Sequence, residues 1–398
     1  MSELAYSFLF KGAYTRDVVS AMAESVHDAL DRPARVAFIF ATSDYLPYVE
    51  ELTDIFRIDG HILNVVVCTA GGIIGGAEEY ESGSGFSLLA VVEPQGEKSA
   101  EFAFVSSEQP DRVWPVDSDD SEGVLLKSFV KECSAGAWLI FADPFVFLSE
   151  DWLQSWNACA PETPLVGGLV SGSADAESVG VFLNGRRIEG ALLVGLHNKL
   201  RLVPAVSQGC RSIGEPLTVT RADSNVVYSL GSHPAYEALE SAFETLTDEE
   251  KNFARGNLLA GLASSEYVED FKSGDFLIRS ILGADPNSGA VAIGAFPRVG
   301  QTMQYQYRDP VGASQDIDKA FSEAAKGIGK PLASLIFACN ERGENFFSRK
   351  NVDAAALERH FGPHPVAGLF CNGEIGPIRG VNSVNTYSAA AALIIEME

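Results

Sequence analysis

The sequence is poor in basic residues and lacks the patterns that mark several common classes of protein. Its 398 residues include 29 lysines and arginines against 54 aspartates and glutamates, which gives a formal net charge of −25. A chain this acidic, without a cluster of basic residues, repels nucleic acid and anionic membranes. No apolar run reaches the roughly eighteen residues of a membrane span. The N-terminus has no basic stretch ahead of its short apolar run, so we expect no secretory signal.

The six cysteines lack the spacing of a disulfide framework or of a metal finger. They lie far apart, none belongs to a C-x-x-C pair, and their neighbours are mostly apolar or small: Cys68, Cys133, Cys159, Cys210, Cys339 and Cys371. Such cysteines are typical of reduced thiols in a cytosol. We therefore expect a soluble cytoplasmic protein without a metal site.

Apolar residues make up 46% of the chain, enough for well-packed cores, and some of them recur in a pattern. Three short apolar runs have the length of buried strands, at 35–43, 137–144 and 334–341. Each run follows one amphipathic helix pattern and precedes another. A second apolar run that ends in glycine then completes each unit, at 65–76, 164–172 and 365–373. This recurring order predicts an internal repeat of helix, strand, helix and strand.

The recurrence predicts an α/β protein with mixed β-sheets flanked by helices, a layered α/β sandwich in two related halves. The first half, 1–217, would hold two repeat units, at about 13–115 and 116–217. The second half, 218–398, would hold a degenerate unit at about 232–312 and an intact unit at 313–398.

The glycine-rich turn in VCTAGGIIGG, at 67–76, resembles a phosphate-binding loop at first sight. Such a loop needs a helix N-terminus directly behind it. Here AEEYESGSG and another apolar strand follow, and Glu78, Glu79 and Glu81 would repel a phosphate. The glycines therefore indicate tight turns and close packing where strands converge, or the backbone lining of a shared cleft.

Several motifs in one order resemble the FIST family, in both its N-terminal and its C-terminal part. They span about 35–378 and read VCTAGGIIGGAEEYE, PLVGGLVSG, VFLNG, VSQGCRSIGEPLTVT, GDFLIR, QYQYRDP, IFACNERG and VAGLFCNGEIGPI. The resemblance implies an intracellular signal-transduction module that senses small ligands such as amino acids. Some family members are coupled to kinases, cyclases, chemoreceptors or an F-box, and a subset is reported to bind heme.

An attached output domain is not expected in this chain. The first repeat begins by Thr15, and the last predicted strand reaches the end of the sequence. We therefore expect the signal to leave through a partner protein of unknown identity.

The resemblance and the residue types together predict a site for a small, amino-acid-like polar molecule. A guanidinium and a carboxylate in one cleft suit the two ends of a zwitterion. The predicted ligand-binding residues are Gly71, Gly72, Gly168, Arg279, Arg308, Asp309, Arg342, Asn372, Gly373 and Glu374.

Two details qualify this set of residues. Arg308 and Asp309 are adjacent on a strand-like segment, so a structural ion pair with other residues is an equal alternative for them. Glu374 is the leading candidate because EIGPI, with its glycine and proline, is not expected to form a regular strand after the Asn372-Gly373 turn.

Two other functions remain open as alternatives. A cysteine-dependent hydrolase or transferase would use Cys371 as nucleophile and His364 as base. These two residues are seven apart on a predicted strand, which places them on opposite faces, so no catalytic residue is predicted. A heme-binding gas sensor would use His233 or His364 as axial ligand, without covalent attachment, because C-x-x-C-H is absent. No cofactor is predicted, and heme stays an alternative.

Overall fold

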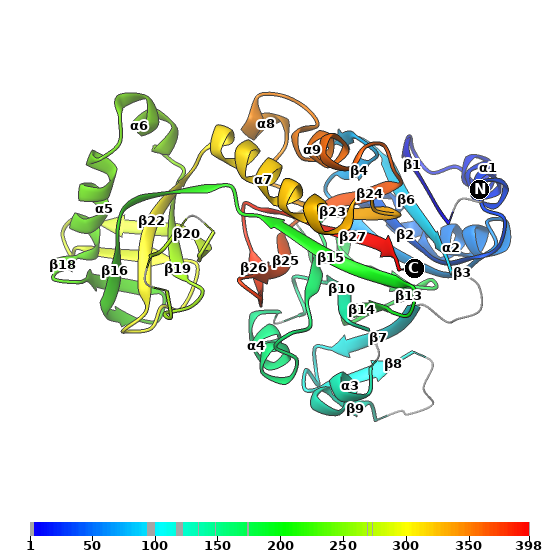
Figure 1. Cartoon of the computed structure of the whole chain (residues 1–398), viewed down its shortest axis with the longest axis horizontal. Helices are drawn as coiled ribbons and strands as arrows, with labels where there is room; N and C mark the ends of the chain where they lie inside the picture. Colours follow the sequence, from blue (N-terminus) through cyan, green and yellow to red (C-terminus); the bar gives the residue numbers. More distant parts are fainter. Residues whose placement is uncertain are drawn as a thin grey trace. The chain divides into compact units, whose positions relative to one another are not determined.

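The computed structural model describes residues 4–93, 100–116, 122–133, 135–147, 149–172, 175–268, 270–272 and 274–397. These residues form helices and several mixed β-sheets, so the predicted α/β class is confirmed (Figure 1). Among them, no helix is both long and apolar enough to span a membrane.

Contacts within the chain divide it into two compact units. Unit 1 comprises Met1–Val206, Asp318–Val384 and Ser388–Glu398, and unit 2 comprises Ser207–Ile317 and Asn385–Tyr387. The boundary between residues 217 and 218 that the sequence suggests stays a prediction.

The described part of unit 1 contains three sheets, each built on a pair of parallel strands. The pairs are β2 (Ala34–Thr42) with β3 (Ile62–Ala70), β10 (Ala137–Ala142) with β11 (Leu165–Leu169), and β23 (Ala333–Cys339) with β24 (Val366–Cys371). Next to the first strand of each pair lies an antiparallel strand, namely β6 (Gly85–Val92), β14 (Gly190–Leu196) or β27 (Ala389–Glu396). The next positions hold β1 (Ala5–Lys11), β7 (Ala100–Ser106) and β15 (Leu200–Ser207). These four positions have the same order in all three sheets, and the second sheet continues beyond β7 through β8 (Arg112–Pro115) and β9 (Val124–Leu125).

Each sheet is completed by a hairpin that follows a parallel pair of another sheet. The hairpin of β4 (Ile73–Gly75) and β5 (Glu78–Tyr80) follows β3 but pairs with β24. The hairpin of β12 (Val181–Leu183) and β13 (Arg186–Arg187) follows β11 but pairs with β3. The strands β25 (Gly373–Ile378) and β26 (Val381–Asn385) follow β24, and β25 pairs with β11. This strand exchange links the three sheets in a closed cycle. The internal repeat of the sequence itself stays a prediction.

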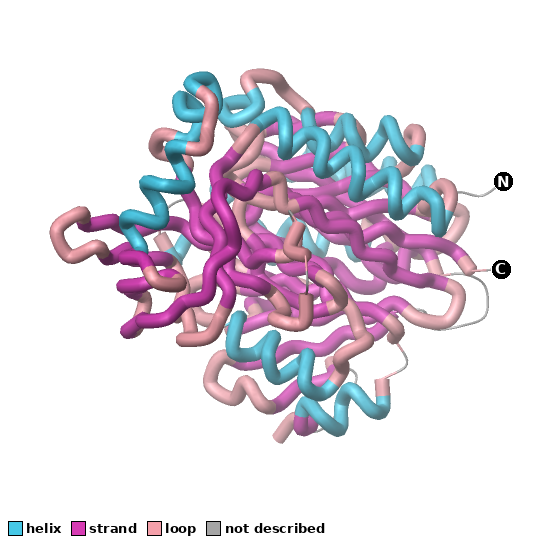
Figure 2. The backbone as a smooth tube through the Cα atoms, turned by 60° about the vertical axis from the view of Figure 1, so that its left-hand side comes forward, coloured by secondary structure: helices cyan, strands magenta, loops and turns pink. Residues whose placement is uncertain are grey.

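Helices cover the outer faces of these sheets (Figure 2). The parallel pairs are connected through α2 (Val49–Ile58), α4 (Ser149–Cys159) and α9 (Val352–Phe361), and they are preceded by α1 (Arg16–Ala29), α3 (Leu126–Glu132) and α7 (Pro310–Ile328). All six were predicted from amphipathic patterns. The last of them, α9, ends at Gly362, whose φ of +71° favours glycine. Short helices lie at Ser43–Tyr48 (η1), Ala176–Ser178 (η2) and Glu344–Phe347 (α8).

The central core of unit 1 lies between the three sheets. Phe40 of β2, Phe141 of β10 and Phe337 of β23 are fully buried there. Their ring centroids are 6.0 Å (Phe40 to Phe141), 6.3 Å (Phe40 to Phe337) and 6.0 Å (Phe141 to Phe337) apart. Each ring therefore contacts the other two at distances suited to aromatic pairs. We call these residues the phenylalanine triad.

Unit 2 is a closed barrel of antiparallel strands. Its six strands, in order around the barrel, are β16 (Cys210–Asp223), β22 (Thr302–Arg308), β19 (Leu258–Ala263), β20 (Phe276–Asp285), β21 (Ala290–Ile293) and β17 (Val226–Leu230). The barrel closes because β17 also pairs with β16. The two-residue strand β18 (His233–Pro234) extends β17, and α5 (Ala235–Glu244) and α6 (Asp248–Ala254) contribute to the core.

This barrel was not predicted. Every strand pair among the described residues of unit 2 is antiparallel, whereas each sheet of unit 1 has a parallel pair. The topology therefore gives no support to a fourth, degenerate repeat at 232–312.

Phe337→Ala is expected to lower the free energy of unfolding by about 3–5 kcal/mol, because it leaves a cavity where the three sheets meet. Phe145→Ala is the matched control, since the Phe145 side chain is 51% exposed. Urea unfolding of both variants measures the difference. Equal losses in the two proteins would contradict a central role for the phenylalanine triad.

Candidate functional site

The second strands of the three parallel pairs end at a common junction in unit 1. The N–H of Ser171 donates to the carbonyl of Thr69 at 3.3 Å, and the N–H of Asn372 donates to the carbonyl of Leu169 at 2.9 Å. The third link is direct, because the N–H of Phe370 donates to the carbonyl of Gly72 at 2.9 Å. A side chain adds to these backbone bonds. The N–H of Gly71 donates to Ser171 Oγ at 2.7 Å, and this hydroxyl donates to the carbonyl of Phe370. These bonds join the three strand ends in a cycle.

The predicted glycines of unit 1 lie at or beside this junction. A Cβ on Gly71 would lie 3.1 Å from Asn340 Oδ1, and one on Gly72 would lie 2.8 Å from the Phe370 ring. A Cβ on Gly168 would lie 2.6 Å from Cys371 Sγ. Close packing thus accounts for these glycines. Whether the junction also binds a ligand stays a prediction.

Asn372 and Gly373 form the step from β24 to β25. The side chain of Asn372 accepts a hydrogen bond from Asn340 Nδ2 at 2.9 Å and donates to the carbonyl of Val170 at 3.2 Å. Gly373 pairs with Leu169 across β25 and β11. The expectation that EIGPI forms no regular strand is therefore wrong. β25 accommodates its glycine and proline because its pairing with β11 covers only Gly373–Ile375 and ends before Gly376 and Pro377.

Glu374 is completely buried in β25. Its Oε2 accepts hydrogen bonds from the N–H of Ser388 at 3.2 Å and from Ser388 Oγ at 2.6 Å. Its Oε1 has no hydrogen-bond partner among the described residues. Burial raises the pKa of Glu374 to about 8, although the Ser388 bonds and the charge of Arg342 oppose the rise. The carboxyl group is therefore mostly protonated at neutral pH.

Arg342 is fully buried in a bidentate ion pair. Its Nε and Nη2 each lie 2.7 Å from an oxygen of Asp353, at the start of α9. The N–H groups of Asp353 and Ala354 donate to Glu79 Oε1 at 2.8 and 2.9 Å. Burial, followed by the charge of Asp353, raises the pKa of Glu79 to about 7. Arg342, predicted as a ligand-binding residue, thus links the loop after β23 to α9.

The other charged residues of the predicted site belong to unit 2. Arg279 is buried in β20 and donates from Nη1 to the carbonyl of Ile278. Arg308 is buried at the end of β22, with its guanidinium 4.7 Å from the centre of the Tyr387 ring. Asp309 Oδ1 accepts the N–H of Val311 at the start of α7. A cleft that combines these residues with Glu374 of unit 1 stays a prediction.

The residues of the two alternative functions are also placed. Cys371 is completely buried, and this burial raises the pKa of its thiol well above the usual range, which keeps it protonated. Both ring nitrogens of His364 are hydrogen-bonded. Nε2 lies 2.8 Å from Ser334 Oγ, and Nδ1 lies 2.8 Å from the carbonyl oxygen of Gly362. A nucleophilic Cys371 or a heme-ligating His364 would require a change in these surroundings.

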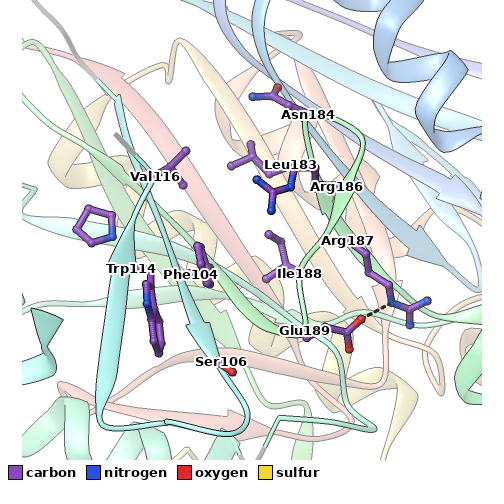
Figure 3. A pocket seen from close by; sticks show the side chains of 11 residues that line it. Phe104, Ser106, Trp114, Val116, Leu183, Asn184, Arg186, Arg187, Ile188 and Glu189 are labelled. Atoms are coloured by element: carbon purple, nitrogen blue, oxygen red, sulfur yellow. Dashed lines mark ion pairs between the residues drawn. The ribbon is translucent and has the colours of Figure 1, made fainter. Parts of the chain in front are cut away.

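A pocket of about 510 Å³ lies elsewhere in unit 1, between the strands β7 and β8 (Arg112–Pro115) and the segment 183–189 (Figure 3). Phe104 and Trp114 are cross-strand neighbours, and their rings stack with centroids 5.5 Å apart and planes 9° apart. Figure 3 shows these rings on one side of the pocket and Arg186 and Ile188 on the other. The lining is completed by Ser106, Pro115, Val116, Leu183, Asn184, Arg187 and Glu189.

The two consecutive arginines of this pocket differ in their contacts. Arg187 Nη2 donates to the carbonyl of Val179 at 2.6 Å and lies 3.4 Å from Asp143 Oδ2, and its Nε lies 3.5 Å from Glu189 Oε1. Arg186 is exposed, and no described residue pairs with it. In the sequence, VFLNG, at 181–185, served only as a motif of the family resemblance, and the two arginines that follow it were missed. The signal that could have found them is the pair of adjacent arginines itself, which is unusual in so acidic a chain.

Glu374→Gln is expected to reduce the pH dependence of stability. The folded protein keeps the Glu374 proton up to a pH of about 8, while the unfolded chain loses it near the ordinary pKa of 4.5. The free energy of unfolding of the wild type should therefore fall between these pH values, and the glutamine variant should fall less steeply. Chemical unfolding at pH 5.5, 7 and 8.5 measures both slopes, and identical slopes would contradict a protonated buried Glu374.

Arg342→Met is expected to destabilise unit 1 by about 3–5 kcal/mol, because it leaves the buried Asp353 carboxylate without its partner. Arg57→Met is the control, since Arg57 is exposed on α2. Thermal unfolding compares them. If Arg342→Met unfolds like the control, the ion pair does not hold α9 in place.

Two family models together cover most of the chain. The FIST N domain matches residues 35–233, and the FIST C domain matches residues 235–377. An uncharacterized protein of Mycobacterium tuberculosis is 33% identical over 338 residues, which cover 83% of this chain and 84% of that protein. An uncharacterized protein of Mycobacterium bovis is 36% identical over 259 residues, which cover 65% of this chain and 67% of that protein. FIST domains are sensory domains of signal transduction, and this chain belongs to the FIST family.

Proposed function

We propose that this chain is a cytoplasmic sensory module that binds a small polar ligand and passes the bound state to a partner protein. The observation that carries the proposal is the pocket of about 510 Å³ in unit 1, which combines an aromatic stack with a guanidinium. A sensory domain needs a site where a small molecule changes the free energy of one conformation relative to another.

The size and lining of the pocket fit a small metabolite. Pockets for small molecules usually enclose about 300–1,000 Å³ and combine apolar walls with a few polar groups. Phe104, Trp114 and Ile188 supply apolar surface here, and Arg186 supplies a charge-assisted hydrogen-bond donor. A ligand with a carboxylate, the group that the expected amino-acid-like molecules contain, would place that carboxylate on Arg186.

The position of the pocket suggests how binding could be transmitted. Its aromatic wall lies on β7 and β8, whereas Leu183, Arg186 and Arg187 lie on the β12–β13 hairpin, which pairs with β3 in another sheet. A ligand that contacts both walls would favour the conformation in which they are closest. A partner protein that binds only this conformation would detect the ligand as a population shift.

The cysteines support the proposed compartment. All six are free thiols, and four of them are buried. Unpaired cysteines in this number are typical of a reducing cytosol.

A thermal-shift screen with amino acids and related metabolites tests the proposal. A ligand of the pocket should raise the melting temperature of the wild type and of Glu374→Gln, and the shift should be lost in Trp114→Ala. Phe145→Ala serves as the control for removal of an aromatic side chain. Ligands that shift Trp114→Ala as much as the wild type would remove the pocket from the proposal, and loss of the shift in Glu374→Gln alone would move the site to the strand junction.

A further inference from the structure

We propose that the pocket of Figure 3 selects a planar aromatic carboxylate, which carries one negative charge and places its ring between Phe104 and Ile188. This inference rests on the proposed function, because it names the class of ligand that the same pocket would bind.

The charge of the ligand follows from the two arginines. Figure 3 shows the Arg187 and Glu189 side chains turned toward each other, with their ion pair marked, while Arg186 lies on the side that faces the aromatic rings. Arg187 is also held by the Val179 carbonyl and by Asp143, whose side chain is 2% exposed. Arg186 therefore supplies the available positive charge, and its planar fork matches a carboxylate.

The same contacts disfavour two related ligands. An ammonium group would compete with Arg187 for Glu189, which is the one carboxylate among the described residues that line the pocket. A phosphate dianion would bring twice the charge to a single guanidinium, in a chain whose formal net charge is −25. A carboxylate monoanion needs no acidic partner and brings half the charge of the dianion.

The shape of the ligand follows from the aromatic wall. Phe104 and Trp114 are directly opposite each other on β7 and β8, which fixes their stack. The indole is also held by Gly123, where a Cβ would lie 2.6 Å from Trp114 Cε2. Ile188 lies across the pocket from this stack. A flat ring can contact an aromatic face on one side and an aliphatic side chain on the other. Aromatic stacking then stabilises the complex beyond the effect of the apolar area that the ring buries.

Isothermal titration calorimetry with naphthalene-2-carboxylate tests the inference, with its neutral amide and with cyclohexanecarboxylate as comparison probes. The proteins are the wild type, Arg186→Gln and the control Arg57→Gln, which removes an exposed arginine from α2. We expect the naphthalene carboxylate to bind the wild type and the control equally. Its affinity should fall about tenfold or more in Arg186→Gln, the loss expected for a charge-assisted hydrogen bond. The amide and the cyclohexane acid should bind the wild type about tenfold more weakly.

The outcomes separate this inference from the proposed function. If the amide binds as tightly as the acid, or if Arg186→Gln binds like the control, the carboxylate class is wrong. If no probe binds, but a metabolite shifts the wild type and not Trp114→Ala, the inference fails and the proposed function stands. If the binding of the probes does not depend on Arg186, and the thermal shifts caused by metabolites do not depend on Trp114, both the inference and the proposed function are wrong.

Discussion

The contact between Phe40, Phe141 and Phe337 brings together three sheets whose strands come from distant parts of the chain. Each ring is fully buried and lies within about 6 Å of the other two. Around this contact, each parallel pair of strands gives its following hairpin to another sheet. No sheet of unit 1 is complete without strands that follow another parallel pair, so the three sheets depend on one another for stability.

The packing of three sheets around one core determines the structural role of the polar residues near its centre. The hydrogen bonds of Ser171 and Asn372 join the strand ends, and Arg342 with Asp353 holds α9 beside them. Glu374 lies in the same interior and is kept mostly protonated by its burial. Most of these groups have hydrogen-bond partners inside the protein, which is the ordinary condition for polar groups in a core. The pocket with an available charge lies farther out, where a hairpin of one sheet faces two strands of another.

Sequence reasoning recovered the elements better than their arrangement. The run 137–144, which contains β10, was predicted as a strand because a short, continuous apolar run between two amphipathic helices has few other interpretations. The strand exchange was not predicted, because which strand pairs with β25 depends on residues about 200 positions away. The barrel of unit 2 was missed because its strands are short or interrupted by bulges, as in β16 between Ile213 and Leu217.

For the candidate site, too, the sequence identified some residues but not their arrangement. Arg342 was predicted as a site residue and Arg186 was not, although both are arginines. Only the structure shows that Arg342 is held in an ion pair with Asp353 and that Arg186 lines a pocket. The predicted glycines do lie at converging strands, because a glycine at the end of a short apolar run commonly marks close backbone packing. The atoms that a Cβ would meet come from other strands, and the sequence alone did not identify them. Partners of a side chain are set by long-range packing, which a single sequence does not contain.

Native-state hydrogen exchange of the full chain tests the interdependence of the three sheets most directly. If the sheets form one cooperative structure, the slowest amides of β2, β10 and β23 should open with the same free energy, equal to that of unfolding unit 1. Exchange of β23, β24 and β27 at a clearly lower free energy than β2 and β10 would show that the third sheet opens alone, and it would contradict the mutual dependence of the three sheets.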